Sequence, residues 1–434
     1  MKFFVPALFC ACLCLVLNSA ATAQSDSSDV VKDLEAWLKK PADERGDFSK
    51  QPFRNQGLTK KQASATKELL WDDYVSRKKE SRKKEWEDKV IKLGDLSMKF
   101  EYKVFGKKPK DGRSLFISMH GGGGAPARVN DQQWKNQIGL YEPKEGVYLA
   151  PRAPTNTWNL WHEPHIDKFF QRIIQSAILF EDVNPNRVYI MGYSAGGDGV
   201  YQLAPRMADS LAAAAMMAGH PNGVSPAGMR NIGFTLHMGG QDSAYKRNKI
   251  AAQWKTKLAK LKQEDPEGYK HEVVIHEDCG HWMKRKDAVA VPWMAKFTRN
   301  PRPDKVVWRQ TGVTHDSFYW MWQRPDDVRK KTKVVASIKN QTIKIESFSG
   351  LDKVGFQLND QILDLDDSVT IDFGDGTKFA RRVDRRLSHI YESIEKNGDP
   401  ELIYSAKFTA PFPKEVVEKQ KKASESATES DKSK

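Results

Sequence analysis

Residues 187–197 read Arg-Val-Tyr-Ile-Met-Gly-Tyr-Ser-Ala-Gly-Gly. The pattern predicts a short apolar strand over 188–191 that runs directly into Gly192-x-Ser194-x-Gly196 and then into a helix. A serine on such a turn has a strained backbone, and only very small residues two positions before and after it avoid clashes with the strand and the helix. The turn lifts the Ser194 hydroxyl clear of the sheet and beside the free N–H groups of a helix N-terminus. We therefore interpret this segment as a nucleophile elbow.

Predicted strands and helices alternate on both sides of this segment. Short apolar or alternating runs predict strands at 96–105, 115–119, 147–150, 211–217, 232–238 and 272–276. Helical spacing of apolar residues predicts helices at 169–178, from the elbow to 207, and at 246–262. This alternation is typical of a mostly parallel sheet flanked by helices, so we predict an α/β fold with its main domain at 93–300.

The two ends of the chain are polar. Residues 24–92 are charged and helix-prone, which indicates solvated helices that brace the main domain or act as a spacer. Residues 413–434 are rich in Lys, Glu and Ser, and we predict a disordered tail there.

A small β-rich module is predicted at 301–412. Short alternating runs indicate strands at 334–338, 342–346, 369–373 and 402–408. Asp375-Gly376 suits a tight hairpin turn, and 387–394 suits a single helix. The aromatic run Phe-Tyr-Trp-Met-Trp at 318–322 predicts a buried strand that joins two domains; a surface that grips a polymer is the alternative.

The N-terminus has the pattern of an export signal at 1–23. Lys2 precedes a continuous apolar run at 7–17, and Ala-Thr-Ala at 21–23 suits cleavage after Ala23. The apolar run is too short to cross a bilayer as a helix, so no transmembrane segment is expected. Three of the four cysteines lie in this peptide, which leaves only Cys279 and no internal disulfide. We therefore predict a secreted or periplasmic protein.

The formal net charge of the chain is +14. Such a balance favours anionic surroundings, such as acidic polysaccharide, envelope lipid or nucleic acid, and charge alone does not choose among them. Well-solvated surfaces explain the charge better than a nucleic-acid site does. The sequence has no zinc-finger spacing, RNA-binding signature or helix-turn-helix pattern, so a nucleic-acid partner is not expected.

Ser194 needs a base to accept its proton and an acid to orient that base. The segment Gly-Gly-Gln-Asp242 follows one predicted strand, and Cys-Gly-His281-Trp follows a later one. Both lie in glycine-containing loops, so we predict Asp242 as the orienting acid and His281 as the general base. His276 and Asp278 are the rival base and acid.

A glycine loop, His-Gly-Gly-Gly-Gly at 120–124, follows the strand predicted at 115–119. Backbone N–H groups arranged around a developing oxyanion stabilise the tetrahedral intermediate of acyl transfer. We predict one donor from Gly121 or Gly122 and the other from Ala195. A phosphate-binding loop is not indicated, because no Gly-Lys-Ser/Thr follows.

In combination, these motifs resemble the α/β-hydrolase superfamily, and within it the exported esterases grouped with polyhydroxybutyrate depolymerases and feruloyl or acetylxylan esterases. The resemblance covers about residues 95–300. It implies an α/β-hydrolase catalytic domain at 93–300 that cleaves small or polymeric carboxylic esters through an acyl-serine, with no cofactor and no metal. A prolyl-oligopeptidase-type peptidase and a catalytically inactive hydrolase fold that acts as a binding module are the alternatives.

Three tryptophans lie where a substrate pocket is expected. Trp158 and Trp161 fall in the loop after the strand predicted at 147–150, and Trp282 follows the proposed base. Loops at the carboxyl ends of strands line ligand sites in such sheets. We predict that these rings contact the substrate, with core packing as the alternative.

Overall fold

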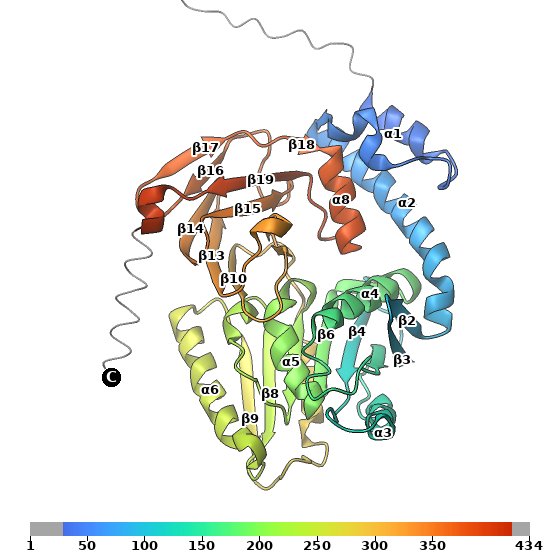
Figure 1. Cartoon of the computed structure of the whole chain (residues 1–434), viewed down its shortest axis with the longest axis vertical. Coiled ribbons are helices and arrows are strands. Elements are labelled where there is room, and N and C mark those ends of the chain that lie inside the picture. Colours follow the sequence, from blue (N-terminus) through green and yellow to red (C-terminus); the bar gives the residue numbers. More distant parts are fainter. Residues whose placement is uncertain (1–28, 419–434) are drawn as a thin grey trace, which may run out of the picture.

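The computed structural model describes residues 29–418 (Figure 1). The predicted export signal at 1–23 lies outside these residues. The predicted tail at 413–434 is described only to 418, and within that part Val416 is buried against the β-rich module, which therefore extends past 412. Over residues 29–418, no helix is both long and apolar enough to cross a membrane.

An eight-stranded sheet forms the centre of the main domain. In the order in which they pair, its strands are β2 (Val90–Leu93), β3 (Leu96–Phe105), β5 (Gly146–Pro151), β4 (Arg113–Met119), β6 (Val183–Tyr193), β7 (Ala213–Met217), β8 (Gly233–Gly239) and β9 (His271–His276). The pairings β2–β3 and β3–β5 are antiparallel, and all others are parallel. With its flanking helices, this sheet confirms the predicted α/β-hydrolase fold class.

Helices cover both faces of the sheet. They are α3 (Ala127–Ile138), α4 (Pro164–Phe180), α5 (Ala195–Arg206), α6 (Arg247–Glu264) and α7 (Ala290–Met294). Side chains of β6 alternate between two cores, because successive residues of a strand point to opposite faces. Val188 and Ile190 pack in the cluster that includes α4, α5 and α6, whereas Tyr189 and Met191 pack in the cluster that includes α7. The sheet is therefore buried on both faces.

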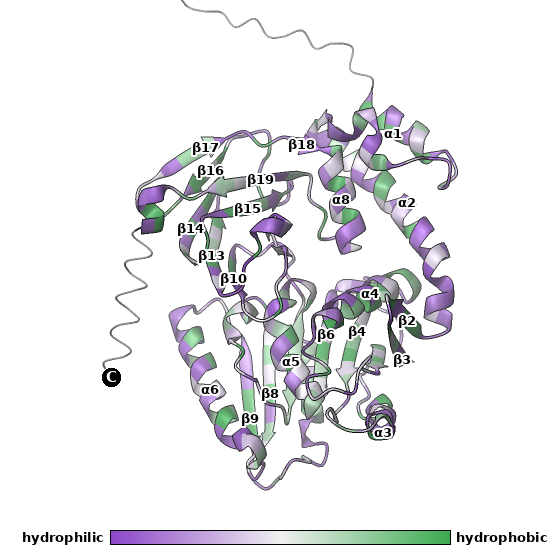
Figure 2. Cartoon of the chain, in the orientation of Figure 1, coloured by the Kyte–Doolittle hydropathy of each residue, from purple (hydrophilic) through white to green (hydrophobic). Residues whose placement is uncertain are grey.

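The N-terminal segment forms two helices, α1 (Val30–Leu38) and α2 (Lys60–Glu87). Figure 2 shows hydrophilic residues dominating α2 and hydrophobic residues dominating β4 and β6. The helix α2 nevertheless joins two parts of the molecule. Its Arg77 pairs with Glu395 of α8 (Leu387–Asn397), and its Glu85 pairs with Arg172 of α4 at 2.9 Å. Both ion pairs come from the second half of α2, and they link this charged helix to α8 and to α4.

The β-rich module consists mainly of two sheets. One pairs β10 (Lys305–Gln310), β13 (Thr332–Lys339), β14 (Thr342–Ser349), β16 (Val369–Asp372) and β17 (Lys378–Arg381). The other pairs β11 (Ser317–Phe318), β12 (Met321–Trp322), β15 (Lys353–Leu358) and β19 (Ala406–Pro411). A short pairing of β1 (Gly57–Leu58) with β18 (Arg385–Arg386) ties the module to the N-terminal segment.

The aromatic run at 318–322 differs from its prediction as a single strand. It forms a tight hairpin between β11 and β12, with Tyr319 at a positive φ of 53° at the turn. Its first four residues are buried, as predicted. Burial alone does not distinguish a strand from a hairpin, and a non-glycine residue at positive φ leaves no mark in the sequence.

The β-rich module packs against the amino ends of the parallel strands. Tyr319 donates a hydrogen bond to the carbonyl of Ala208, just before β7, at 2.8 Å. Asn231, just before β8, donates to the carbonyl of Lys305 at 2.9 Å. Figure 1 shows the module at the upper end of the sheet, away from the arrowhead of β8. The carboxyl ends of the strands are therefore on the opposite edge.

Candidate active site

Ser194 lies at the sharp turn between β6 and α5, with φ 58° and ψ −120°. The glycines of the motif are required by close backbone contacts. A Cβ at Gly192 would lie 2.3 Å from the carbonyl oxygen of Gly196, and a Cβ at Gly196 would lie 2.2 Å from that of Met119. The strained backbone is held by a hydrogen bond from the Ser194 N–H to the Met217 carbonyl, at 2.9 Å.

Three predicted residues come together at the carboxyl edge of the sheet. His281 Nε2 lies 3.0 Å from Ser194 Oγ, and His281 Nδ1 lies 2.7 Å from Asp242 Oδ2. The Asp242 side chain is almost completely buried, and its other oxygen lies 3.6 Å from a guanidinium nitrogen of Arg247. This geometry allows Asp242 to hold the imidazole with Nε2 directed at the serine hydroxyl.

The rival residues lie elsewhere. His276 Nε2 contacts His237 Nδ1 at 3.3 Å, and the two rings stack. Burial lowers the pKa of His276. Asp278 is exposed and pairs with Lys286 at 2.5 Å. Neither residue is placed to serve Ser194.

The glycine loop lies beside the serine. A Cβ at Gly121 would lie 3.3 Å from Ser194 Cβ, which is a tight contact, so glycine at this position favours a close approach of the loop backbone to the serine. Over residues 29–418, no hydrogen bond is present from the N–H of Gly121, Gly122 or Ala195. The next N–H along, that of Gly123, donates to Asn130 Oδ1 at 2.8 Å. The three candidate oxyanion donors are therefore available to a ligand.

His120 holds this loop in place, a role that the sequence did not reveal. Its Nδ1 lies 2.5 Å from the carbonyl of Gly121, and its Nε2 accepts the Ala153 N–H at 3.2 Å. The ring is completely buried, which lowers the pKa of His120 to about 4 and keeps it neutral. A neutral ring that donates through Nδ1 and accepts through Nε2 satisfies both contacts.

Tyr193 holds the loop that carries His281. Its hydroxyl donates to the His281 carbonyl at 2.6 Å and accepts the Met283 N–H at 2.9 Å. This contact joins residues 88 positions apart, and the only sequence signal for it is the place of Tyr193 next to the nucleophile. The Tyr193 hydroxyl therefore positions the loop that carries the base.

The three predicted tryptophans are placed differently. Trp158 and Trp282 are 63% and 50% exposed, near Gly124 and Tyr193 respectively. Trp161 is a correction, because its side chain is fully buried and its indole N–H donates to the His120 carbonyl at 2.9 Å. Its hydrogen bond to His120 stabilises the glycine loop from the protein interior, and its burial prevents contact with a substrate. Tyr245, three residues after Asp242, is a further exposed ring that the sequence analysis missed, at 77%.

Within residues 29–418, no group of three or more His, Cys, Asp or Glu side chains could hold a metal ion. Cys279, two residues before His281, is a buried free cysteine.

Residues 148–311 match the Dienelactone hydrolase family. No protein with a curated description matches the chain. Three solved structures are similar to about half of this chain. A thermostable esterase is 17% identical (TM-score 0.36), over 48% of this chain and 62% of that one. The apo form of Thermogutta terrifontis esterase 2 is 18% identical (TM-score 0.34), over 48% and 90%. The feruloyl esterase module from Clostridium thermocellum, complexed with sinapinate, is 13% identical (TM-score 0.35), over 48% and 86%.

The family match covers the strand, elbow and later loops that carry Ser194, Asp242 and His281. Taken with the observed strand order, it identifies the domain built on the central sheet as a carboxylic ester hydrolase domain of the serine esterase type, with the α/β-hydrolase fold.

Proposed function

We propose that the protein is an exported serine esterase that hydrolyses carboxylic esters through an acyl-serine intermediate. The observation that carries this proposal is the continuous chain of contacts from Ser194 Oγ through His281 to buried Asp242, at 3.0 Å and 2.7 Å. A nucleophile within reach of a base that is itself oriented by a third group is the arrangement that nucleophilic catalysis requires.

In the first half-reaction, Ser194 Oγ attacks the ester carbonyl carbon while His281 Nε2 accepts the hydroxyl proton. The resulting oxyanion accepts hydrogen bonds from the N–H of Ala195 and from that of Gly121 or Gly122. When the tetrahedral intermediate collapses, the bond to the alkoxide breaks and His281 returns the proton to it. The alcohol leaves, and the acyl group stays on Ser194.

In the second half-reaction, a water molecule takes the place of the alcohol. His281 accepts a proton from the water as the oxygen attacks the acyl carbon, and the Ser194–acyl bond then breaks with the proton returned to Ser194 Oγ. Asp242 holds His281 Nδ1 and stabilises the imidazolium that forms twice in the cycle. The products are the carboxylic acid and free enzyme.

The surface around Ser194 favours a substrate with an apolar or aromatic part. Large exposed hydrophobic side chains are few over residues 29–418, and they are Val104, Trp158, Tyr245, Trp282 and Val289. Trp158 adjoins the glycine loop, Tyr245 follows the acid and Trp282 follows the base, so each segment of the site contributes one ring. Exposed rings around a reacting group offer contact area to an acyl chain or a phenolic ring.

Export is the second part of the proposal, and it rests on the sequence of residues 1–23 alone. Its test is separate from that of the activity. Expression of the full chain in a bacterium, followed by N-terminal sequencing of the protein from the periplasm or medium, should give a new terminus after Ala23. Protein that stays in the cytoplasm with an intact terminus would contradict export.

Activity is tested with a fluorophosphonate probe and p-nitrophenyl esters of increasing acyl length. We expect labelling and turnover, both lost in Ser194→Ala, with kcat lower by about 10⁴- to 10⁶-fold. His281→Gln should have the same effect, whereas His276→Gln, the matched control, should leave turnover nearly unchanged. A folded protein that is neither labelled nor active would indicate a binding module. Labelling with turnover of peptides but not esters would indicate a peptidase.

A further inference from the structure

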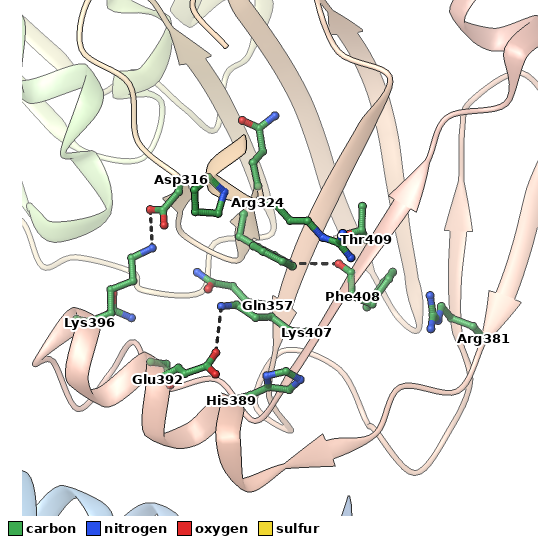
Figure 3. Close-up of a pocket in the computed structure, with 15 residues that line it drawn as sticks. Asp316, Arg324, Gln357, Arg381, His389, Glu392, Lys396, Lys407, Phe408 and Thr409 are labelled. Carbon is green, nitrogen blue, oxygen red and sulfur yellow. Dashed lines mark hydrogen bonds and ion pairs between the residues drawn. The ribbon is translucent and has the colours of Figure 1, made fainter. Parts of the chain in front are cut away.

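The β-rich module contains an open cleft of about 730 Å³ (Figure 3). It lies between α8 and the strands β12, β15, β17 and β19, with the loop that follows β12 at its rim. Its charged lining residues are Asp316, Arg324, Arg381, Glu392, Lys396 and Lys407. None of these residues takes part in the proposed catalysis.

The charges in this cleft do not balance. Both carboxylates already have basic partners: Lys396 lies 2.6 Å from Asp316, and Glu392 lies 2.8 Å from Arg54 and 4.0 Å from Lys407. Over residues 29–418, neither Arg324 nor Arg381 has an acidic partner. In Figure 3, Arg324 is drawn next to Thr409, and Arg381 lies beyond Phe408. The cleft therefore has two spare guanidinium groups, each able to hold a carboxylate with two parallel hydrogen bonds.

Aromatic rings fix some of the cations in position. The Trp322 ring lies against the backbone of β15, since a Cβ at Gly355 would lie 2.4 Å from its indole nitrogen. The Lys407 ammonium lies 4.6 Å from the centre of this ring, and the Arg381 guanidinium lies 5.0 Å from that of Phe408. Lys407 is partly buried against its ring, which strengthens the attraction of its charge for an anion, whereas Arg381 is exposed and remains accessible to a ligand. Burial accordingly lowers the pKa of Lys407.

Neutral hydrogen-bonding groups lie among these cations. The Gln357 amide N–H donates to the Tyr319 carbonyl at 2.7 Å, which leaves its side-chain oxygen free to accept. His389 has a buried Nδ1 with no partner over residues 29–418. Burial is the main reason that the pKa of His389 is lowered to about 4, and Lys407 is the nearby cation that lowers it most. The ring is therefore neutral. Such a lining suits a ligand that carries hydroxyl groups as well as negative charge.

The site has room for more than one small anion. A second cavity of about 570 Å³, between the module and the main domain, shares Asp316, Pro325, Lys396 and Asn397 with the cleft. Each cavity is within the range that holds a ligand of several rings. The second cavity is lined by four carboxylates, those of Asp167, Asp209, Asp316 and Asp399, so the negatively charged part of a ligand fits the cleft that holds the two arginines.

We propose that this cleft binds an acidic carbohydrate chain, built from uronic acid residues, with Arg324 and Arg381 holding carboxylates and Gln357 accepting from a hydroxyl group. The module packs against the amino ends of the parallel strands, whereas Ser194 is at their carboxyl ends, so the cleft in the module does not adjoin Ser194. Binding here attaches the enzyme to an anionic matrix and leaves turnover of a soluble ester unchanged.

The test is calorimetric titration of the full chain with a galacturonic acid tetrasaccharide, at low and at physiological salt. We expect saturable binding to the wild type and affinity at least about tenfold weaker in the double variant Arg324→Gln/Arg381→Gln. The matched control, Arg309→Gln/Arg382→Gln, removes the same charge from exposed positions of the module outside the cleft and should change affinity little. Hydrolysis of p-nitrophenyl acetate should be the same in all three proteins.

Four results would overturn the proposal. The first is the absence of saturable binding, and the second is equal binding of a neutral galactose tetrasaccharide. The third is equal weakening in the control variant, which would show attraction to overall charge only. The fourth is inorganic phosphate competing at equal concentration, which would make the cleft a phosphate site. If the glutamine variant is misfolded by circular dichroism, Arg324→Lys/Arg381→Lys keeps the charge and should still weaken binding, because lysine cannot bind a carboxylate with two parallel bonds.

Discussion

Removal of one hydroxyl, by Tyr193→Phe, should slow catalysis because this hydroxyl holds the loop that carries His281. The hydroxyl joins β6 to the loop of the base through two bonds, at 2.6 Å to the His281 carbonyl and 2.9 Å from the Met283 N–H. Phenylalanine leaves both backbone groups without that partner. A buried group left unsatisfied costs about 1–3 kcal/mol, so we expect the free energy of unfolding to fall by about 2 kcal/mol, with part of the loss recovered from water.

The catalytic effect follows from the geometry of the triad. His281 is 44% exposed, so Asp242 and Tyr193 fix its position more than packing does. A displacement of about 1 Å at a reacting group can lower the rate about 100-fold. We therefore expect kcat on p-nitrophenyl butyrate to fall by about 10- to 100-fold with KM nearly unchanged, because ground-state binding does not use this hydroxyl.

Tyr189→Phe is the matched control for this experiment. Tyr189 is on the same strand, and its hydroxyl donates to the Phe297 carbonyl at 2.8 Å, away from the triad. Its loss should lower stability by about 1 kcal/mol and leave kcat unchanged. Stopped-flow turnover and thermal unfolding of both variants give the comparison. If Tyr193→Phe retains wild-type kcat, or if the two variants slow catalysis equally, the reasoning about the His281 loop is refuted.

Three other predictions follow from buried contacts. Burial lowers the pKa of His120 to about 4 and that of His237 to about 3, whereas both are about 6.5 in the unfolded chain, so the unfolded chain binds more protons below pH 6.5. The free energy of unfolding should therefore be constant above pH 6.5 and fall toward pH 4. A melting temperature that stays level from pH 7 to 4.5 would contradict this. Gly196→Ala places a methyl group 2.2 Å from the Met119 carbonyl oxygen. The substitution should destabilise the protein by about 1–3 kcal/mol and abolish fluorophosphonate labelling. A stable, labelled variant would show that the elbow relaxes freely. Trp161→Ala should lower the free energy of unfolding by about 3–5 kcal/mol, because this side chain is buried. The exposed Trp158, changed to Ala, should alter it by less than about 0.5 kcal/mol and raise KM for long acyl chains. Similar stability losses in the two variants would contradict the buried position of Trp161 and the exposed position of Trp158.

The sequence predicted the elements around the nucleophile well because their signals are local. A strand, a turn and a helix over 187–197 are specified by an apolar run and by glycines at fixed positions. The acid and the base were predicted because parallel strands place their carboxyl ends on one edge, so loops after different strands meet there. The contacts from His281 to Ser194 and Asp242 have the order that this topology requires.

Other features depend on contacts that no local pattern contains. Trp158 and Trp161 lie three positions apart in one loop, yet one is exposed and the other buried, because only the latter reaches the His120 carbonyl. The predicted strand at 318–322 became a hairpin since Tyr319 adopts a positive φ, supported by its hydroxyl bond to Ala208. The cleft of the β-rich module joins Arg324 and Arg381 from separate strands and loops, and nothing between them in the sequence marks that pairing.

The separation of the catalytic triad from the cleft in the β-rich module has a kinetic consequence. The triad is at the carboxyl ends of the strands, and the β-rich module covers the amino ends, so a ligand held by the module does not enter the reacting site directly. Attachment to an acidic polymer then raises the effective concentration of esters on the same matrix near the enzyme, so that enzyme and ester encounter each other more often. The chemistry of each turnover is unchanged. For an ester attached to such a polymer, loss of Arg324 and Arg381 should raise KM and leave kcat constant, whereas loss of Ser194 should remove kcat and leave binding to the polymer intact.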